Sequence, residues 1–291
     1  MTAGAAIRGP AGRSAGRRTA TVVIVLLVAS FAADAARAVS ISPIAVYIDA
    51  RMRTGALMLH NDGILSEEIE IDFAFGYPIS DSSGNITVQL VHDAPPGEPS
   101  LVPWISAFPR RMLLVPGQRQ VVRMLVEPPA GLADGEYWAR VLIRSRGGQP
   151  TVEQHRADGG RIQLAIETVV AVPVSYRQGH VATGIRLDHV RAVQLGDTVT
   201  VSVDLSRTGN AAFLGRLQAE ILAGDRVVGS SEVLLGVYRS LRQVVRLPVP
   251  AGVTAPLTVR LLLDTNRDDL PDGGVLYAPA VSRSVIIETP P

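Results

Sequence analysis

The sequence predicts an all-β protein built from two immunoglobulin-like β-sandwich domains in tandem. Apolar and polar residues alternate over residues 67–75 and 197–205, as they do in strands with one buried face. Turn signals recur at short intervals, for example Asn61-Asp62-Gly63 and Pro116-Gly117. No stretch after the amino-terminal segment has the 3.6-residue period of a helix. Short strands separated by regular turns are typical of sandwiches.

Composition narrows the classes of function. The chain has 291 residues, which suffices for two domains of roughly 100–200 residues each. Its net charge of +1, with basic and acidic residues interspersed, gives no indication of a nucleic-acid partner. The absence of Cys excludes disulfides, thiolate metal sites and cysteine nucleophiles. We expect no cofactor.

The amino terminus has the three parts of a secretory signal. Arg8, Arg13, Arg17 and Arg18 form a basic region, residues 19–33 an apolar one, and Ala36-Arg37-Ala38 a small-x-small cleavage site. We therefore expect residues 1–38 to be a signal peptide and the mature chain to be periplasmic. An uncleaved anchor is the alternative, although the apolar run is shorter than the ~20 residues of a membrane span.

The first domain is expected to cover residues 39–178. The predicted strands there are residues 42–48, 56–60, 67–75, 86–91, 105–108, 120–126, 137–144 and 161–176. Residues 78–85 and 144–160 are expected to be loops, because they are rich in Gly, Ser, Asn and other turn residues.

The last of these strands carries the main functional prediction. Ile162, Leu164 and Ile166 alternate with polar or small residues, and the run from Val169 onward is almost continuously apolar. One long strand thus starts as an apolar ridge and ends in a core. A ridge of this kind suits pairing with another chain; an ordinary core-facing strand edge is the alternative.

The second domain is expected to cover residues 179–291. Its predicted strands are residues 183–192, 197–206, 213–223, 226–234, 242–247, 257–264 and 281–288, with a hairpin turn at Gly224-Asp225.

Signals of catalysis and metal binding are weak. Residues 264–269 place carboxylate and amide oxygens as calcium loops do, but Asp269 stands where Gly is expected and Val275 where Glu is expected. The pattern favours a solvated loop. The five His lack ligand spacing, and no Gly-x-Ser-x-Gly elbow or phosphate-binding loop occurs. We expect no enzyme, no catalytic residues and no bound metal.

Several segments resemble the periplasmic chaperones of pilus (fimbrial) assembly. Ile41-Ser42-Pro43-Ile44-Ala45-Val46 is similar to that family's first strand, and Leu57-Met58-Leu59-His60-Asn61 to its second. The most specific match is Leu113-Leu114-Val115-Pro116-Gly117-Gln118-Arg119-Gln120-Val121-Val122-Arg123. Gly135-Glu136-Tyr137-Trp138-Ala139-Arg140 and Val172-Pro173-Val174 match later strands. The resemblance covers residues 39–177. The second domain resembles the family only in its fold class, a β-sandwich.

The resemblance implies a chaperone that donates the last strand of its first domain to a pilin-like subunit lacking a strand. By position, the donor side chains are Ile162, Leu164 and Ile166. Members of the family usually hold the subunit's carboxyl terminus with an Arg in the first strand and a Lys in the last. Here the position in the first strand is Ala45, and the position in the last strand is Ala171 or Pro173. Arg177 or Arg51 would have to bind the carboxyl terminus in their place.

Two functions therefore remain open. The first is a periplasmic chaperone for a pilin-like or other secreted β-rich subunit, with an outer-membrane usher as a further partner. The second is a secreted structural or adhesive β-sandwich protein without chaperone activity, which the missing basic residues favour. An unpaired apolar strand also predicts self-association.

Overall fold

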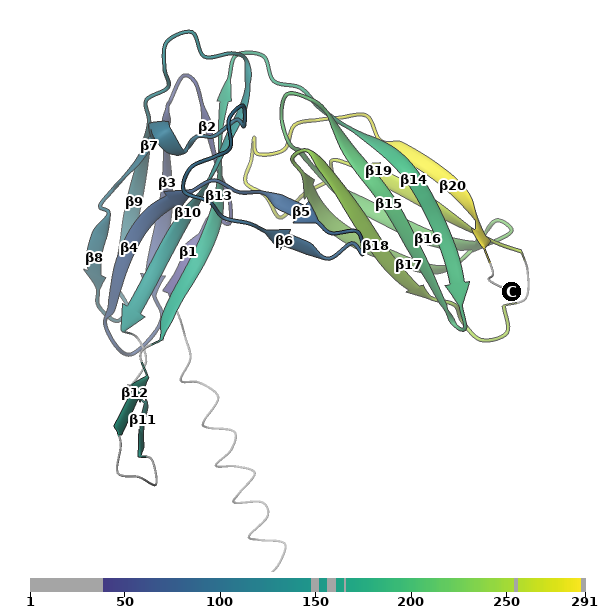
Figure 1. Ribbon diagram of the computed structural model, residues 1–291, viewed down its shortest axis with the longest axis horizontal. Helices are drawn as coiled ribbons and strands as arrows, with labels where there is room; N and C mark the ends of the chain where they lie inside the picture. Colours follow the sequence, from purple (N-terminus) through teal and green to yellow (C-terminus); the bar gives the residue numbers. More distant parts are fainter. Residues whose placement is uncertain (1–38, 148–151, 156–160, 165, 254–255, 289–291) are drawn as a thin grey trace, which may run out of the picture.

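The computed structural model describes residues 39–147, 152–155, 161–164, 166–253 and 256–288. They form two β-sandwiches joined at an angle, with a concave side between them (Figure 1). The predicted all-β, two-sandwich fold is confirmed. The expected signal peptide lies outside the described residues. Among those described, no helix has the length and apolar character to cross a bilayer.

The first sandwich packs a four-stranded sheet, in the order β1-β3-β9-β7, against a five-stranded sheet, in the order β2-β13-β10-β4-β8. A short 3₁₀ helix, Val102–Trp104, precedes β7. The bounds are β1 Val39–Ser42, β2 Val46–Asp49, β3 Thr54–Asn61, β4 Glu67–Ala74, β7 Ile105–Phe108, β8 Arg111–Leu114, β9 Arg119–Val126, β10 Gly135–Gly147 and β13 Glu167–Gln178.

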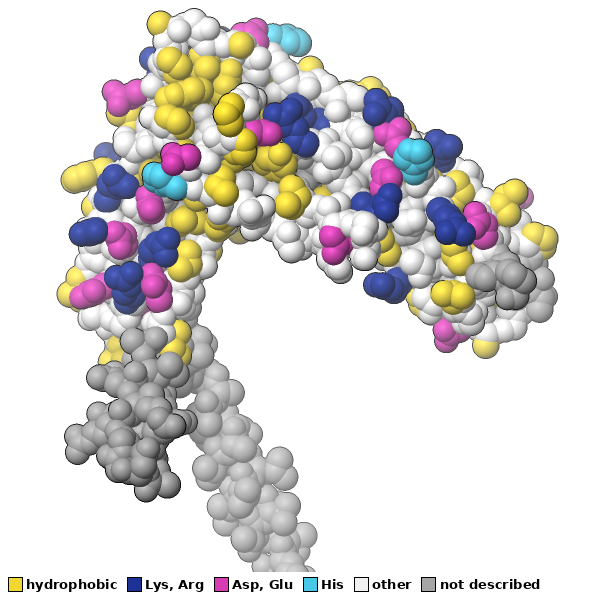
Figure 2. Space-filling view, in the orientation of Figure 1, with side chains coloured by type: hydrophobic (Ala, Val, Ile, Leu, Met, Phe, Trp, Pro, Cys, Tyr) yellow, Lys and Arg dark blue, Asp and Glu magenta, His cyan; other side chains and the backbone are white. Residues whose placement is uncertain are grey.

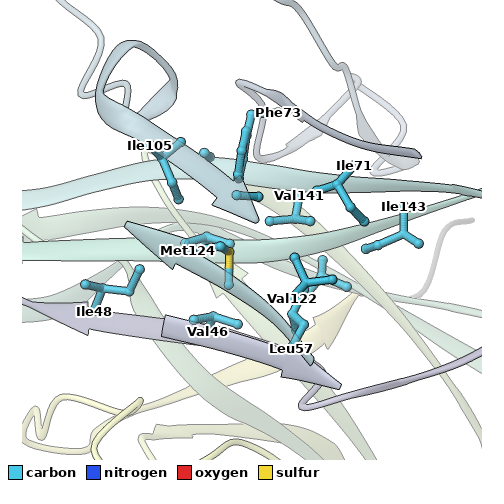
Figure 3. Packing of buried hydrophobic residues seen from close by; sticks show 14 of the residues in the cluster. Val46, Ile48, Leu57, Ile71, Phe73, Ile105, Val122, Met124, Val141 and Ile143 are labelled. Carbon is cyan, nitrogen blue, oxygen red and sulfur yellow. The ribbon is translucent and has the colours of Figure 1, made fainter. Parts of the chain in front are cut away.

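Alternate residues of these strands form the first core. Val141 and Ile143 of β10 meet Leu57 of β3 and Val122 and Met124 of β9 between the sheets (Figure 3). These side chains are almost fully buried, as expected from the period of two.

The second sandwich is one seven-stranded sheet, in the order β17-β16-β19-β20-β14-β15-β18, folded over its own core. Val199, Val201, Val203 and Leu205 are buried, so the predicted alternation of residues 197–205 is confirmed. All seven predicted strands are present: β14 Thr183–Leu195, β15 Thr198–Gly209, β16 Phe213–Ala223, β17 Arg226–Val237, β18 Ser240–Pro248, β19 Leu257–Asp264 and β20 Val281–Glu288.

Strand β10 also faces the second sandwich. Its core-facing residues alternate with Glu136, Trp138 and Arg140, which point away from the first core. Trp138 packs edge-on against Tyr238 of the second sandwich, with ring centroids 4.9 Å apart. Phe75 and Ala212 complete this buried cluster. The two sandwiches therefore share a small core of their own.

A hairpin that we call the arm, residues 78–90, leaves the first sandwich and crosses to the second (Figure 1). It consists of β5 Pro78–Ser80 and β6 Ile86–Val88. Its tip is fastened to β18: the Arg242 amide donates to Ser80 Oγ at 2.6 Å, and the Arg242 guanidinium donates to Ser82 O at 3.0 Å. The side chain of Asp81 accepts bonds from the Ser83 and Asn85 amides and shapes the turn. Residues 78–85, predicted as a loop, are thus partly strand.

Two other predictions of strand extent are wrong. The expected strand 42–48 is split at Pro43 into β1 and β2, which belong to different sheets, because proline lacks the N–H needed to continue a ladder. The expected loop 144–160 contains the end of β10 and a short strand, β11 Val152–His155.

Candidate functional site: an open strand edge beside an interdomain cluster

Strand β13 has one edge that is paired over its full length and another that is largely open. It pairs antiparallel with β10 from Glu167 to Gln178. On its other side it pairs with β2, in parallel, only from Val174 to Arg177. Among the described residues, none pairs with that side between Glu167 and Pro173. The backbone N–H and C=O groups there are free to bond to an added strand.

The open edge carries apolar side chains. Val172, Val174 and Tyr176 point into the first core and are buried. Val170 and Ile166 continue the same phase of the strand but lie beyond the covered part of the core, with 38% and 50% of their surface exposed. Val169, on the opposite face, is 44% exposed. We call Ile166, Val169 and Val170 the open-edge residues.

The predicted donor residues do not lie on one continuous strand. Ile166 lies just before β13, at the start of the open edge. Ile162 and Leu164 belong to β12, Arg161–Leu164, whose backbone pairs with β11. Their side chains lie outside the described part of the structure, so their role stays a prediction. The single strand expected over residues 161–176 is instead two, because β12 ends at Leu164 and β13 begins at Glu167.

Ala45 and Ala171, the positions that lack the expected basic residues, offer no charged group in the structure. Ala45 is 2% exposed and lies between β1 and β2, whereas Ala171 is exposed on the outer face of β13. Neither can hold a carboxylate. Pro173, however, lies directly opposite Arg140 of β10. A guanidinium therefore stands one strand away from the position where the sequence lacks a basic residue.

Arg140 is buried without a carboxylate partner. Only 9% of its surface is exposed, and its Nε donates to Gly76 O at 3.1 Å. Its guanidinium lies over the Tyr238 ring at 5.9 Å. Within the described ranges, no ion pair to Arg140 is formed. A buried guanidinium retains part of its desolvation cost until an anion binds to it.

Arg177, one of the two predicted substitutes, is already occupied. Its Nε donates to Glu136 Oε2 at 2.8 Å, and its two terminal nitrogens donate to Gly273 O, at 2.7 Å, and to Gly274 O. Only 12% of the Arg177 side chain is exposed. Arg177 therefore joins the two sandwiches and is not available to a client. Arg51 is exposed in the turn after β2.

The surroundings of Glu136 are strongly desolvated. Besides Arg177, its carboxylate accepts bonds from Trp138 Nε1 at 2.7 Å and from the Ala212 amide at 3.4 Å. Burial raises the pKa of Tyr47 and of Tyr238, whose rings lie beside this cluster. Burial, reinforced by nearby Arg239, lowers the pKa of the Arg207 guanidinium. The cluster is thus a place where an anion would meet few competing waters. Figure 2 shows basic side chains gathered where the sandwiches meet.

The role of Arg140 was not predicted, and of the arm only the strand over residues 86–91 was, without its partner strand β5. Arg140 could have been found from its phase, because it shares a strand face with Glu136 and Trp138. The arm gave a weaker signal, since its strands are only three residues each. In the 264–269 loop, which was expected to be solvated, both ends carry ion pairs: Asp264 pairs with Arg216 at 2.8 Å and Asp269 with Arg267 at 2.7 Å. No group of metal-ligating residues is found in the described part of the chain.

Comparison with known proteins finds likeness in fold alone. No family model and no curated protein matches the chain. Chaperones of pilus assembly recur among the solved structures that it resembles. The YadV chaperone matches with 12% identity and a TM-score of 0.44, over 85% of this chain and 99% of that one. The CupB2 chaperone of Pseudomonas aeruginosa matches with 12% identity and a TM-score of 0.41, over 86% of this chain and 100% of that one. The CsuC–CsuE chaperone–adhesion subunit complex of Acinetobacter baumannii matches with 12% identity and a TM-score of 0.40, over 70% of this chain and 89% of that one. Likeness at this level leaves function to be argued from the chain's own residues.

Proposed function

We propose that the chain is a periplasmic chaperone that binds an incomplete β-rich subunit, pilin-like or related, along the open edge of β13. The observation that carries this proposal is the unpaired stretch from Glu167 to Pro173 with Ile166, Val169 and Val170 exposed. A sheet edge without charge or bulge attracts a strand from another chain, and soluble proteins usually blunt such edges. Here residues 168–172 are Thr-Val-Val-Ala-Val, with no charge at all.

The edge is suited to a client that lacks a strand. An added strand would gain main-chain hydrogen bonds to β13, and the alternate side chains would fix its register. Ile166, Val169 and Val170 are each about half exposed, so burying what remains contributes about 1–2 kcal/mol apiece. The predicted residues Ile162 and Leu164 would extend the same contact if β12 continued the strand when the client binds.

Arg140 supplies an anchor that the expected positions lack. A client strand on the open edge would end near Pro173, where β2 occupies the rest of β13. Arg140 lies opposite Pro173 and lacks an acidic partner in the described structure. We therefore assign to Arg140 the binding of the client's carboxyl terminus, in place of the basic residues absent at Ala45 and Ala171. A guanidinium can bind a carboxylate through two hydrogen bonds.

The test isolates the tagged chain from the cell envelope of its own organism and compares the wild type with Val170→Asp. Val227→Asp is the matched control, because Val227 is a similarly exposed valine, 43%, in the second sandwich. We expect a β-rich subunit to copurify with the wild type and the control only. In that complex the amides of residues 168–172 should be protected from hydrogen exchange. Arg140→Gln should weaken the complex, and Leu164→Asp tests the extension through β12.

Two results would reject the proposal: the same partners with Val170→Asp as with the wild type, or a bound subunit that leaves residues 168–172 unprotected. The alternative, a structural or adhesive protein, is favoured by the apolar residues at Ala45 and Ala171. It predicts that the chain is found assembled at the cell surface, whereas a chaperone stays free in the periplasm.

A further inference from the structure

The arm and the second sandwich enclose a polar cavity of about 890 Å³. Its floor is the outer face of β14, β15 and β18, and residues 79–82 of the arm form one wall. Figure 2 shows basic, acidic and histidine side chains intermixed on the second sandwich beside the arm. Ligand sites in proteins usually measure about 300–1,000 Å³ and are mainly apolar. The lining here is mainly charged and hydroxylic, so the cavity suits a small polar molecule.

Two aspartates stand side by side on the floor of the cavity. Asp188 of β14 and Asp204 of β15 lie directly opposite each other in the antiparallel ladder. Like charges at such positions destabilise a sheet. Arg186 Nε donates to Asp188 Oδ1 at 2.9 Å. Arg242 Nε donates to Asp204 Oδ1 at 2.6 Å. These bonds lower the pKa of both carboxyl groups, so the cavity holds two ionised carboxylates at neutral pH.

His189 lines the cavity from a strained backbone position. Its φ is 43°, in the left-handed region that favours glycine. It lies where the pairing of β14 with β15 shifts, between Asp188 and Arg191. Bulges of this kind re-aim a side chain and are common next to functional sites. Among the described residues that are not glycine, only Arg53 shares a positive φ. Glycine would fit this backbone better, so the imidazole calls for a role beyond the fold.

The charges around the cavity are balanced. Its lining holds as many basic as acidic side chains: Arg186, Arg239, Arg242, Asp81, Asp188 and Asp204. A ligand with a net charge would therefore lack a free counter-charge. Hydrogen-bonding capacity remains. Arg186 binds Asp188 through Nε, which leaves its two terminal nitrogens without a partner in the described structure. The carboxylates have further lone pairs, and the hydroxyls of Ser206 and Ser240 lie beside them.

We propose that this cavity binds a neutral sugar, free or as a unit of a glycan, between the arm and the second sandwich. A hydroxyl group both donates and accepts hydrogen bonds. Neighbouring hydroxyls of one sugar ring would therefore donate to Asp188 and Asp204 and accept from Arg186 and from the imidazole of His189. Ile79 of the arm, 37% exposed, would contact the C–H groups of the ring. The opposed carboxylates and the strained His189 then serve one purpose, which is to bind a ligand.

The experiment measures binding to the purified full chain by isothermal titration calorimetry. The probes are glucose, galactose, mannose and N-acetylglucosamine, followed by maltose, lactose and chitobiose, which distinguish a free sugar from a glycan unit. We expect at least one of them to bind at a single site per chain. His189→Gly and Asp188→Asn should each weaken that binding tenfold or more. Arg53→Gly is the matched control, because it relieves the same kind of backbone strain outside the cavity, and it should bind as the wild type does.

Thermal unfolding separates a ligand-binding role of His189 from a structural one. His189→Gly should raise Tm by about 2–4 °C, because glycine adopts a positive φ without strain. We therefore expect a variant that is more stable than the wild type and no longer binds the sugar. A His189→Gly variant that binds normally, or one that loses binding because it unfolds at a lower Tm, overturns the inference.

The class of ligand is tested with two charged probes. Glucose 6-phosphate represents an anion and glycylglycine a zwitterion, and we expect neither to bind more tightly than the neutral sugar. No binding of any neutral sugar, or binding of a charged probe alone, overturns the assignment. The described lining contains no residue of β13, so Val170→Asp should bind the sugar as the wild type does. A chain that binds the sugar and no client would reject the proposed function alone.

Discussion

Replacing Arg177 by Met tests whether the two sandwiches form one cooperative unit. Met keeps much of the aliphatic length and removes the charge. Glu136, whose side chain is 1% exposed, would lose its cationic partner. Removing one member of a buried ion pair costs about 3–5 kcal/mol. Glu136 keeps bonds from Trp138 Nε1 and the Ala212 amide, so we expect the lower part of that range, about 3–4 kcal/mol.

The assay is differential scanning calorimetry. In a protein of about 250 folded residues, 1 kcal/mol shifts Tm by roughly 2–4 °C, so the expected loss is roughly 6–16 °C. Loss of the junction should also split one transition into two. Arg186→Met is the control, because the Arg186 side chain is 64% exposed and its partner Asp188 30% exposed, and it should change Tm little. Adding Glu136→Gln to Arg177→Met should recover part of the loss. A shift no larger than that of Arg186→Met would refute the reasoning.

Three further predictions concern the arm, a buried turn and acid stability. Gly84→Ala should release the arm tip and expose it to proteolysis, because a Cβ there would lie 2.4 Å from Val244; Gly97→Ala, with a similar positive φ and nothing within 4 Å, controls for backbone strain. Asn61→Ala should destabilise the first sandwich in urea by about 2–3 kcal/mol, since buried Asn61 donates to Leu65 O and Leu114 O; an unchanged midpoint would contradict this. A hydrogen bond from Arg242 lowers the pKa of Asp204. The ionised Asp204 therefore contributes fully to folding stability above its unfolded-state pKa of about 4. This contribution is lost as the pH falls through the lower pKa that Asp204 has in the folded protein. In thermal melts, Asp204→Asn should reduce the fall of Tm that accompanies acidification.

Local alternation in the sequence predicted most of the fold. Val199 to Leu205 were assigned to a buried face from the period of two alone, and the structure buries all four apolar side chains. This works because burial on one face of a strand is a local property of the pattern. Sheet membership is not local. Nothing near Pro43 says that the strands on its two sides join different sheets, since β1 pairs with the nearby β3, whereas β2 pairs with β13, which lies far along the chain.

The candidate site was predictable in part for the same reason. The apolar run after Glu167 indicated a strand, but its phase into the core and the length of its open edge depend on where β2 stops pairing. Ile166 was predicted from its alternation with Ile162 and Leu164, and its role in binding a client stays a prediction. The strand face of Arg140 could be read from the sequence, but not the role proposed for it, because that role depends on Pro173 across the sheet and on Tyr238 in the other sandwich. Contacts between distant segments are decided by tertiary packing, not by neighbouring residues.

The hydrogen bonds from Arg177 to the second sandwich affect how the sequence at the junction can change. Its two bonds across the junction go to the main-chain oxygens of Gly273 and Gly274, not to any side chain. The loop that supplies them can therefore change its side chains freely at most positions without losing the bond. The two glycines themselves are constrained, Gly273 by its positive φ of 73° and Gly274 because a Cβ there would lie 2.4 Å from the Tyr47 ring. Little sequence covariation between the two domains is then expected at this contact. Homologues could diverge widely in sequence and keep the same angle between their domains.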